Sequence, residues 1–360
     1  MSKPQENGER IRLLLTDAGS GTFSRRVQGC KSSSKFSLLL PENDAEETLI
    51  PLAERADAIL CFKANVTRRL IRASQSLRFI QKFGVDCKNI DISAASERDV
   101  RVATLPLMRN VTVAEHAMAL MLACARKIIP GHLSVVNAAY ERLGLTPRVT
   151  SQWNHGGNWS GIEGLTELFH KRVGIVGMGD IGIEIAARCR AFRMDILYYQ
   201  RVRHPAKTET TLGINYAPLH ELLSASDYVI LVIPQTPATL RLIGAKELAL
   251  LKPSAILINV ARGAVIDEGA LTACLKDGRI AMAGLDVFET EPLPSSSPLI
   301  TLPNVVLLPH TGAGSNRFWG VDIPAALENI LRFFRTEKVS GVVNPTSPAE
   351  EGMPVCYVCE

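Results

Sequence analysis

Long apolar runs are absent from this sequence of 360 residues. A membrane-spanning helix needs about 20 consecutive apolar residues, whereas the best candidate, residues 113–129, is interrupted by Glu115, His116, Arg126 and Lys127. The N-terminus has no apolar core of the kind found in a signal peptide, and its acidic residues argue against a transit peptide. We therefore expect no membrane segment and a cytoplasmic location.

The sequence also has no clustered cysteines and no strong charge of one sign. Its eight cysteines are scattered, which favours a reducing compartment over a disulfide framework. The terminal pair Cys356 and Cys359 has no second pair nearby, so we expect no metal site. The formal net charge of +4 gives no reason to expect a nucleic acid or an anionic membrane as partner.

Short apolar runs alternate with helical patterns along the chain, which predicts an α/β fold with parallel sheets. The length predicts two domains. Expected strands are residues 11–16, 36–40, 58–62, 77–83, 172–176, 194–199, 228–233, 255–260, 281–285 and 305–308. Expected helices are residues 44–55 with Asp44 as cap, 113–129 with Pro130 after its end, 181–192 and 327–334. Residues 19–37 and 131–170 are expected to be irregular, and 1–9 and 346–360 to be tails.

A glycine-rich GxGxxG segment follows the expected strand 172–176 and opens the next helix. Gly177 allows a tight turn, Gly179 lets the backbone approach a pyrophosphate, and Gly182 lets the helix pack on the strand. The amides of the helix N-terminus then face the anion. The segment predicts a dinucleotide site, for which an ordinary glycine-rich turn is the alternative.

The end of the following strand bears on the choice of cofactor. An acid at this place binds the ribose 2′-hydroxyl of NAD, but this sequence has Gln200, with Arg201, Arg203 and Lys207 close behind. A guanidinium binds a 2′-phosphate that a carboxylate would repel. We therefore expect NADP(H) to be preferred over NAD(H). A solvated basic loop is the alternative, and a nucleic-acid role for it is the least favoured one.

Three later segments place titratable side chains where expected strands end. They contain Arg262, the acids Asp286, Glu289 and Glu291, and His310. Ligands of open α/β sheets bind at the carboxyl ends of the strands. An arginine fits a carboxylate with its planar fork, and an imidazole titrates near neutral pH. These residues could hold a carboxylate and move a proton at a neighbouring carbon.

Taken together, these motifs resemble those of the D-isomer-specific 2-hydroxyacid dehydrogenases over residues 11–345. The resemblance rests on the segments Val113–His116, Gly177–Gly182, Pro234–Thr239, Asn259–Gly263, Gly284–Pro292 and Leu308–Gly312. It implies two Rossmann-like or flavodoxin-like lobes, with the nucleotide lobe inserted into the substrate lobe. The implied boundaries are residues 10–106 and 311–345 for the substrate-binding domain and 107–310 for the NAD(P)-binding domain.

The resemblance also implies the site residues. Arg262 would hold the substrate carboxylate and 2-oxo oxygen. His310 would be the general acid/base, and Glu291 rather than Glu289 would be its partner. Asp286 would contact the nicotinamide carboxamide. Implied cofactor-binding residues are Gly177, Met178, Gly179, Asp180, Ile181, Gly182, Gln200, Arg201, Ile233, Pro234, Thr239, Val260, Ala261, Arg262, Asp286, His310 and Gly312. Implied substrate-lobe residues, whose backbone N–H groups would meet the carboxylate, are Lys63, Ala64, Asn65, Gly84 and Val85.

The implied activity is hydride transfer between NAD(P)H and a small 2-oxo acid, such as glyoxylate or hydroxypyruvate, in a homodimer paired through the nucleotide lobe. Two alternatives stay open: a nucleotide-sensing scaffold or corepressor on the same fold, and an enzyme of another class such as a formate dehydrogenase. Glu291 argues against the latter, since formate enzymes carry Gln there. His116 is expected to be a helix residue at the lobe junction rather than a catalyst. Residues 131–170 look longer than usual, which leaves the choice of substrate open.

Overall fold

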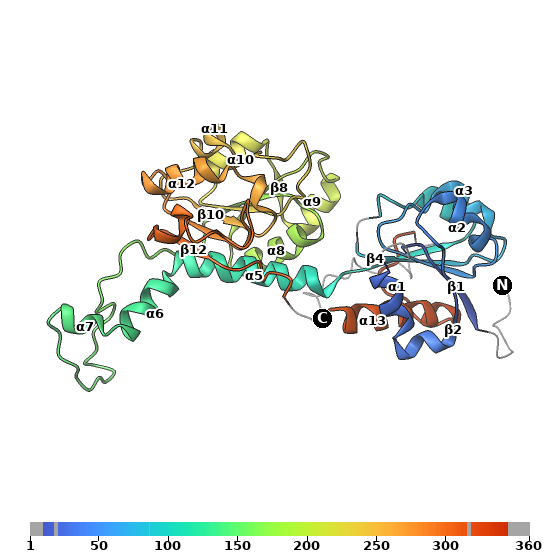
Figure 1. The fold of residues 1–360 in the computed structure, drawn as a ribbon, viewed down its shortest axis with the longest axis horizontal. Helices are drawn as coiled ribbons and strands as arrows, with labels where there is room; N and C mark the ends of the chain where they lie inside the picture. Colours follow the sequence, from blue (N-terminus) through green and yellow to red (C-terminus); the bar gives the residue numbers. More distant parts are fainter. Residues whose placement is uncertain (1–9, 18–20, 86, 315–317, 345–360) are drawn as a thin grey trace. The chain divides into compact units, whose positions relative to one another are not determined.

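The computed structural model of the chain describes residues 10–17, 21–85, 87–314 and 318–344. The chain divides into two compact units: unit 1 comprises residues 1–110 and 315–360, and unit 2 comprises residues 111–314. Each unit contains one parallel sheet with helices on both faces (Figure 1). The predicted fold class of two α/β lobes is confirmed. The predicted tail 346–360, including Cys356 and Cys359, lies outside the described residues.

Unit 1 has a five-stranded sheet in the order β2-β1-β3-β4-β5. Its strands are β1 (Ile11–Leu15), β2 (Phe36–Leu39), β3 (Ala58–Cys61), β4 (Phe79–Phe83) and β5 (Arg101–Leu105). Its helices are α1 (Thr22–Gln28), α2 (Glu46–Ala53), α3 (Arg68–Ala73), α4 (Ile92–Ser96) and α13 (Phe318–Phe334), with the 3-10 turn η2 (Lys31–Lys35). Apolar side chains of α1 and α13 share one buried cluster, and those of α2, α3 and α4 share the other. Each face of the sheet therefore has its own core.

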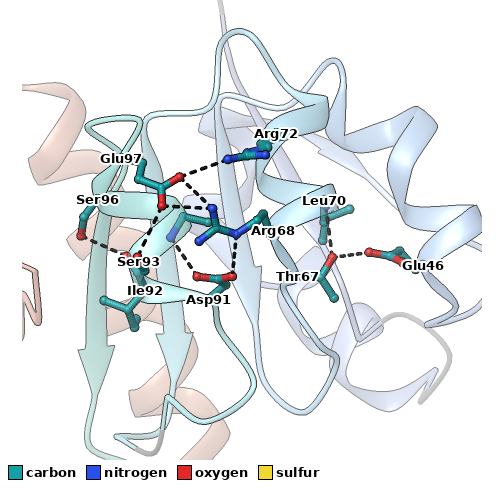
Figure 2. Close-up of polar contacts among 11 residues, drawn as sticks. Glu46, Thr67, Arg68, Leu70, Arg72, Asp91, Ile92, Ser93, Ser96 and Glu97 are labelled. Carbon is teal, nitrogen blue, oxygen red and sulfur yellow. Dashed lines mark hydrogen bonds and ion pairs between the residues drawn. The ribbon is translucent and has the colours of Figure 1, made fainter.

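Helices α2, α3 and α4 are also joined by polar contacts (Figure 2). Thr67 caps α3 by accepting the amide of Leu70 and donates its hydroxyl to Glu46 at the start of α2. Arg68 binds Asp91 at 3.2 Å and Glu97 at 2.9 Å. The hydrogen bond from Arg68 helps to lower the pKa of Glu97. These contacts are structural, because they fix the exposed faces of three helices that pack on the sheet.

Unit 2 has a seven-stranded sheet in the order β12-β11-β10-β9-β6-β7-β8. Its strands are β6 (Arg172–Val176), β7 (Asp195–Tyr199), β8 (Asn215–Tyr216), β9 (Tyr228–Leu231), β10 (Ile256–Asn259), β11 (Met282–Leu285) and β12 (Val305–Leu307). The strand order reverses between β6 and β9, and in open parallel sheets the ligand-binding crevice lies at such a reversal. This is the place where an open parallel sheet binds a dinucleotide.

The helices of unit 2 cover both faces of this sheet. They are α5 (Met108–Ala125), α6 (Ile128–Val136), α7 (Ala139–Arg142), α8 (Asp180–Ala191), α9 (Ala206–Leu212), α10 (Leu219–Ala225), α11 (Ala245–Leu248) and α12 (Glu268–Lys276), with 3-10 turns η3 (Gly263–Val265) and η4 (Pro298–Thr301). Apolar residues of α5 and α8 join the core on one face, and those of α10, α11 and α12 join the core on the other. The first three residues of α5 belong to unit 1, so this helix connects the units.

Four sequence expectations about regular structure were wrong. The described part of the expected loop 19–37 contains α1, which buries Phe23 and Val27 at helical spacing, and η2. Residues 131–170 are not irregular throughout, because they contain most of α6 and all of α7. Helix 113–129 begins earlier, at Met108, and ends at Ala125. Pro130 does not end the helical pattern but occupies the first turn of α6, where a helix needs no amide donor.

Two helix starts also differ from the sequence expectation. Helix α2 begins at Glu46 without a side-chain cap from Asp44, and the amide of Ala45 instead donates to Asn43 at 2.9 Å. Helix α13 begins nine residues before the expected position, at Phe318. Among the described residues, no single helix is long and apolar enough to cross a membrane. Helices α5 and α6 reach the length only together, and they are bent by 62° at their junction.

Candidate active site and dinucleotide site

The glycine-rich loop between β6 and α8 is shaped for an anion. Gly177 has φ +106°, and a Cβ there would lie 2.6 Å from the carbonyl oxygen of Val232. A Cβ on Gly182 would lie 2.2 Å from the carbonyl oxygen of Gly177. Gly179, by contrast, is exposed and has open space beside it at the start of α8. Two glycines are therefore required by packing, and the third leaves backbone amides open to a pyrophosphate. The loop fits the dinucleotide that its sequence predicts.

The loop after β7 is fixed by a polar network. Glu209 of α9 accepts hydrogen bonds from Arg203 at 2.7 and 2.8 Å and from the hydroxyl of Tyr198 at 2.6 Å. The same hydroxyl accepts the amide of His204 at 2.9 Å. Burial and the hydrogen bond to Glu209 raise the pKa of Tyr198 to about 12, so this phenol stays a donor. The loop therefore has a defined shape before any ligand binds.

This network also connects the loop to the glycine-rich turn. The Nε2 atom of His204 lies 2.8 Å from the carbonyl oxygen of Met178. Gln200 turns its amide onto the carbonyl oxygen of Val202 at 2.7 Å. Arg201 is exposed and makes no ion pair within the described parts of the chain. The structure thus separates the basic residues of this loop: Arg203 is bound by Glu209, and Arg201 is not.

Two further loops at the same edge of the sheet contain predicted cofactor residues. After β9, Ile233 and Pro234 lead into a turn that Thr239 closes by donating its hydroxyl to the carbonyl of Pro234 at 2.6 Å. After β10, Val260 and Ala261 are buried. These loops follow adjacent strands of the sheet, so the structure brings these predicted residues to one edge.

Arg262 follows β10 and is exposed, while its backbone is held rigidly. Its carbonyl accepts the side chain of Asn259 at 3.1 Å. Gly263 lies directly against the backbone of Phe288, and a Cβ on Gly263 would come within 1.8 Å of the carbonyl carbon of Phe288. This close approach brings the Arg262 segment against the segment that contains Glu291.

Glu291 and His310 form the central pair of the site. Glu291 Oε2 lies 2.6 Å from His310 Nδ1, and Glu291 Oε1 accepts the amide of Phe288 at 3.1 Å. Partial burial by itself would raise the pKa of Glu291. The hydrogen bonds from His310 and Phe288 and the charges of His310 and Arg262 outweigh burial and lower this pKa. Glu291 is therefore an anion at neutral pH. A cavity of about 550 Å³ with a largely apolar lining opens beside the pair.

Comparisons with known proteins agree with this geometry. Residues 118–312 match the family described as D-isomer specific 2-hydroxyacid dehydrogenase, NAD binding domain. The chain is 37% identical over 299 residues to a glyoxylate reductase of Pyrococcus furiosus, covering 83% of this chain and 85% of that protein. It is 35% identical over 316 residues to a glyoxylate/hydroxypyruvate reductase B of Yersinia pestis, covering 87% and 90%. The chain belongs to the D-isomer-specific 2-hydroxyacid dehydrogenases. It is an NAD(P)-dependent oxidoreductase, and the predicted family is confirmed.

Two solved structures are also similar to this chain. The NADPH-dependent glyoxylate/hydroxypyruvate reductase of Sinorhizobium meliloti, in complex with NADP and malonate, gives a TM-score of 0.52 at 29% identity, covering 93% of this chain and 97% of that one. A protein of Pyrococcus horikoshii gives a TM-score of 0.59 at 27% identity, with coverage of 93% and 96%.

Three of the backbone amides predicted to meet the substrate carboxylate form hydrogen bonds within the protein. The backbone amides of Lys63 and Ala64 already donate to the buried carboxylate of Asp17, at 2.5 and 3.0 Å. The amide of Gly84 donates to the carbonyl of Leu105 at 2.9 Å. These three amides therefore have partners within the protein in this structure. For Lys63, Ala64, Asn65, Gly84 and Val85 the substrate role stays a prediction.

Asp286, predicted to contact the nicotinamide carboxamide, also contacts residues of the protein itself. Its carboxylate is buried, accepts the amides of Thr311 at 2.9 Å and Gly312 at 2.8 Å, and lies 2.9 Å from Nε2 of His116. Asp286 thus binds the turn after His310, in addition to any contact with a cofactor. His116, expected to be a helix residue at the lobe junction rather than a catalyst, lies on α5. Its contact with Asp286 was not predicted.

Proposed function

We propose that this dehydrogenase reduces a small 2-oxo acid, such as glyoxylate or hydroxypyruvate, to the D-2-hydroxy acid, with NADPH as the preferred reductant. The observation that carries the proposal is the 2.6 Å contact between Glu291 and His310, with exposed Arg262 one strand away. The names of the Pyrococcus furiosus and Yersinia pestis relatives support the substrate class.

The chain's own residues would act as follows. Glu291 takes the Nδ1 position of His310, which leaves Nε2 for the carbonyl oxygen of the substrate. Arg262 would bind the substrate carboxylate with its planar fork and so orient C2 of the substrate. When bound, a reduced nicotinamide would supply the hydride for C2. His310 donates a proton from Nε2 to the oxygen, and ionised Glu291 stabilises the protonated imidazole before the transfer.

The preference for NADPH rests on the loop after β7. Gln200 has no charge to repel a phosphate, and Arg201 is exposed beside it. The fixed shape of this loop would hold Arg201 near the 2′-position at little entropic cost. The NADP complex of the Sinorhizobium meliloti relative supports this choice.

We further propose a homodimer that pairs through unit 2. Helices α6 and α7 and the loop after them project from the rest of unit 2 (Figure 1). Their large apolar side chains are exposed, and a contiguous exposed apolar patch of this kind is typical of an interaction surface. The exposed residues are Ile128, Ile129, Leu133, Val135, Val136, Leu143, Leu145, Val149, Trp153, Trp159 and Leu165. A second copy of the chain would cover this arm, defined as residues 128–165. A cytoplasmic location stays a prediction, supported by the six free cysteines among the described residues.

The test is steady-state kinetics of the purified chain with NADH and NADPH against glyoxylate, hydroxypyruvate, pyruvate and phenylpyruvate. We expect turnover with glyoxylate or hydroxypyruvate, a higher kcat/KM with NADPH, and a product of D configuration where C2 is chiral. Tight NADPH binding without turnover of any 2-oxo acid would instead support a nucleotide-sensing scaffold and overturn the proposal.

A further inference from the structure

A second histidine lies next to the catalytic turn, on the helix that connects the two units. His116 of α5 is largely buried, and its Nε2 atom lies 2.9 Å from Oδ1 of Asp286. The N–H direction departs from that of a hydrogen bond, and Nε2 has no other polar partner in the described residues. The interaction is therefore a short electrostatic contact between an imidazole and a buried carboxylate.

Asp286 needs such a partner because its charge is buried. Its side chain is 2% exposed, at the end of β11. A buried carboxylate is costly unless it is hydrogen-bonded and paired with a positive group. The amides of Thr311 and Gly312 supply the hydrogen bonds. Within the described residues, His116 is the basic side chain in contact with this carboxylate.

The turn that Asp286 binds begins with His310. The backbone of His310 has φ +54°, a left-handed conformation that residues other than glycine rarely adopt. Such a conformation persists where the surroundings fix it. The two amides that follow His310 are the ones bound by Asp286. Gly312 packs closely against both Asp286 and His116. A Cβ on Gly312 would lie 3.0 Å from Asp286 Oδ2 and 3.5 Å from His116 Cδ2.

We propose that His116 is a positioning residue for the reaction: through Asp286 it fixes the turn 310–312 and thereby the direction of the His310 imidazole. This inference rests on the proposed function, in which His310 donates the proton. His116 touches neither substrate nor His310 in this arrangement, and it acts by keeping Asp286 in place. Without it, the buried carboxylate would be unpaired, and the strained turn would lose its fixed anchor.

The variants His116→Leu and His116→Gln test this inference. Leucine fills the space but has no donor, whereas glutamine offers an N–H group at a similar reach. Glu115→Gln is the matched control, because Glu115 is adjacent on the same helix and contacts Arg188 rather than Asp286. We expect kcat to fall at least tenfold in His116→Leu, with an unchanged Kd for NADPH, and to recover to within threefold of the parent in His116→Gln and Glu115→Gln.

Hydrogen–deuterium exchange of the cofactor-free protein supplies a readout that needs no turnover. The amides of Thr311 and Gly312 should exchange at least fivefold faster in His116→Leu, while the segment of α8 exchanges as in the parent. An active parent whose exchange and kcat are both unaffected by His116→Leu would overturn the inference and leave the proposed function intact. Faster exchange across all of unit 2 would also overturn it, because His116 would then be a general core residue. A parent with protected amides and no turnover would overturn the proposed function instead.

Discussion

Glu209 binds Arg203 through both carboxylate oxygens, at 2.8 Å to Nε and 2.7 Å to Nη2. The guanidinium of Arg203 is therefore already paired within the protein. From the sequence alone, Arg203 and Arg201 were equally good candidates for binding a phosphate. The preference for NADPH should then depend on Arg201, whose exposed guanidinium has no ion pair among the residues that the structure describes.

Arg201→Ala should weaken the binding of NADPH much more than the binding of NADH. A charge-assisted hydrogen bond to a phosphate contributes roughly 1.5–3 kcal/mol, which corresponds to about ten- to more than a hundredfold in affinity. The kcat/KM for both cofactors measures the effect. Gln200→Asp is the complementary variant: it should repel the phosphate, accept from the ribose hydroxyls and favour NADH. A parent that uses both cofactors equally, and does not respond to Arg201→Ala, would mean that the loop is a solvated surface.

His310→Ala should lower kcat by about 10²- to 10⁴-fold, the range typical of positioned proton transfer. The Kd for NADPH should stay near that of the parent, as fluorescence titration can show. Glu291→Gln should lower kcat less. Because it removes the anion that stabilises the protonated imidazole, it should also move the alkaline limb of the kcat profile to lower pH. Near-parental turnover of His310→Ala would refute the proton-donor role.

Arg262→Lys should raise the KM for the 2-oxo acid sharply and also lower kcat. The ammonium keeps the positive charge but cannot bind a carboxylate with two parallel hydrogen bonds. Steady-state kinetics at saturating cofactor separates the two parameters, and urea unfolding checks that the fold is kept. A KM equal to that of the parent would show that another residue binds the carboxylate.

The ion pair of Glu209 should make stability depend on pH. The hydrogen bond from Arg203 and, to a lesser extent, that from Tyr198 lower the pKa of Glu209 to about 2, well below the usual range of a glutamate. A carboxyl with a lowered pKa stabilises the folded state above the unfolded pKa, and this contribution is lost as pH falls through the folded value. Urea unfolding between pH 6 and pH 2.5 should therefore show that Glu209→Gln is less stable than the parent at pH 6 and that the gap narrows below about pH 4.5. The control is Glu163→Gln, which removes an exposed carboxylate with no ion pair among the described residues. A constant gap would contradict the prediction.

A charge placed in the exposed arm should dissociate the dimer. Stable interfaces bury about 1,600 Å² with a desolvated apolar centre, and Leu133→Asp would put a carboxylate there. Sedimentation equilibrium should give about twice the chain mass of 39.2 kDa for the parent and the chain mass for the variant. Ile300→Asp changes an equally exposed residue of unit 2 outside the arm and should leave the mass unchanged. A monomeric parent would refute the homodimer.

The strands of the sheets were largely predictable because a strand covered on both faces appears as a continuous apolar run. All ten predicted strands are present, with ends within two residues of those observed. The two missed strands have weaker signals: β5 mixes Arg101 and Thr104 with apolar residues, and β8 has two residues. Helix α1 was missed because glycine and serine dominate its surroundings, while its buried pair Phe23 and Val27 is short for a periodic signal.

The candidate site residues that directly follow a strand could be predicted from the sequence. Contacts between residues far apart in the sequence could not. Arg262, Glu291 and His310 each follow a predicted strand, so a parallel sheet brings them to one edge. The contact between His116 and Asp286 joins residues 170 positions apart in the sequence. No local sequence pattern predicts such a contact. For the same reason, the sequence could not show that Asp17 occupies the amides of Lys63 and Ala64.

Because unit 2 is inserted into unit 1 in the sequence, the two units become able to fold at different times during synthesis. Unit 2 is one continuous segment, whereas unit 1 needs residues from both ends of the chain. Ile323, Leu327 and Ile330 of α13 belong to the same buried cluster as Leu13 of β1. This cluster cannot close until the ribosome has released the last helix, by which time the whole dinucleotide unit is already available to fold. Until then, among the described residues, α1 is the only helix of this cluster that can cover Leu13, while about two hundred residues are added.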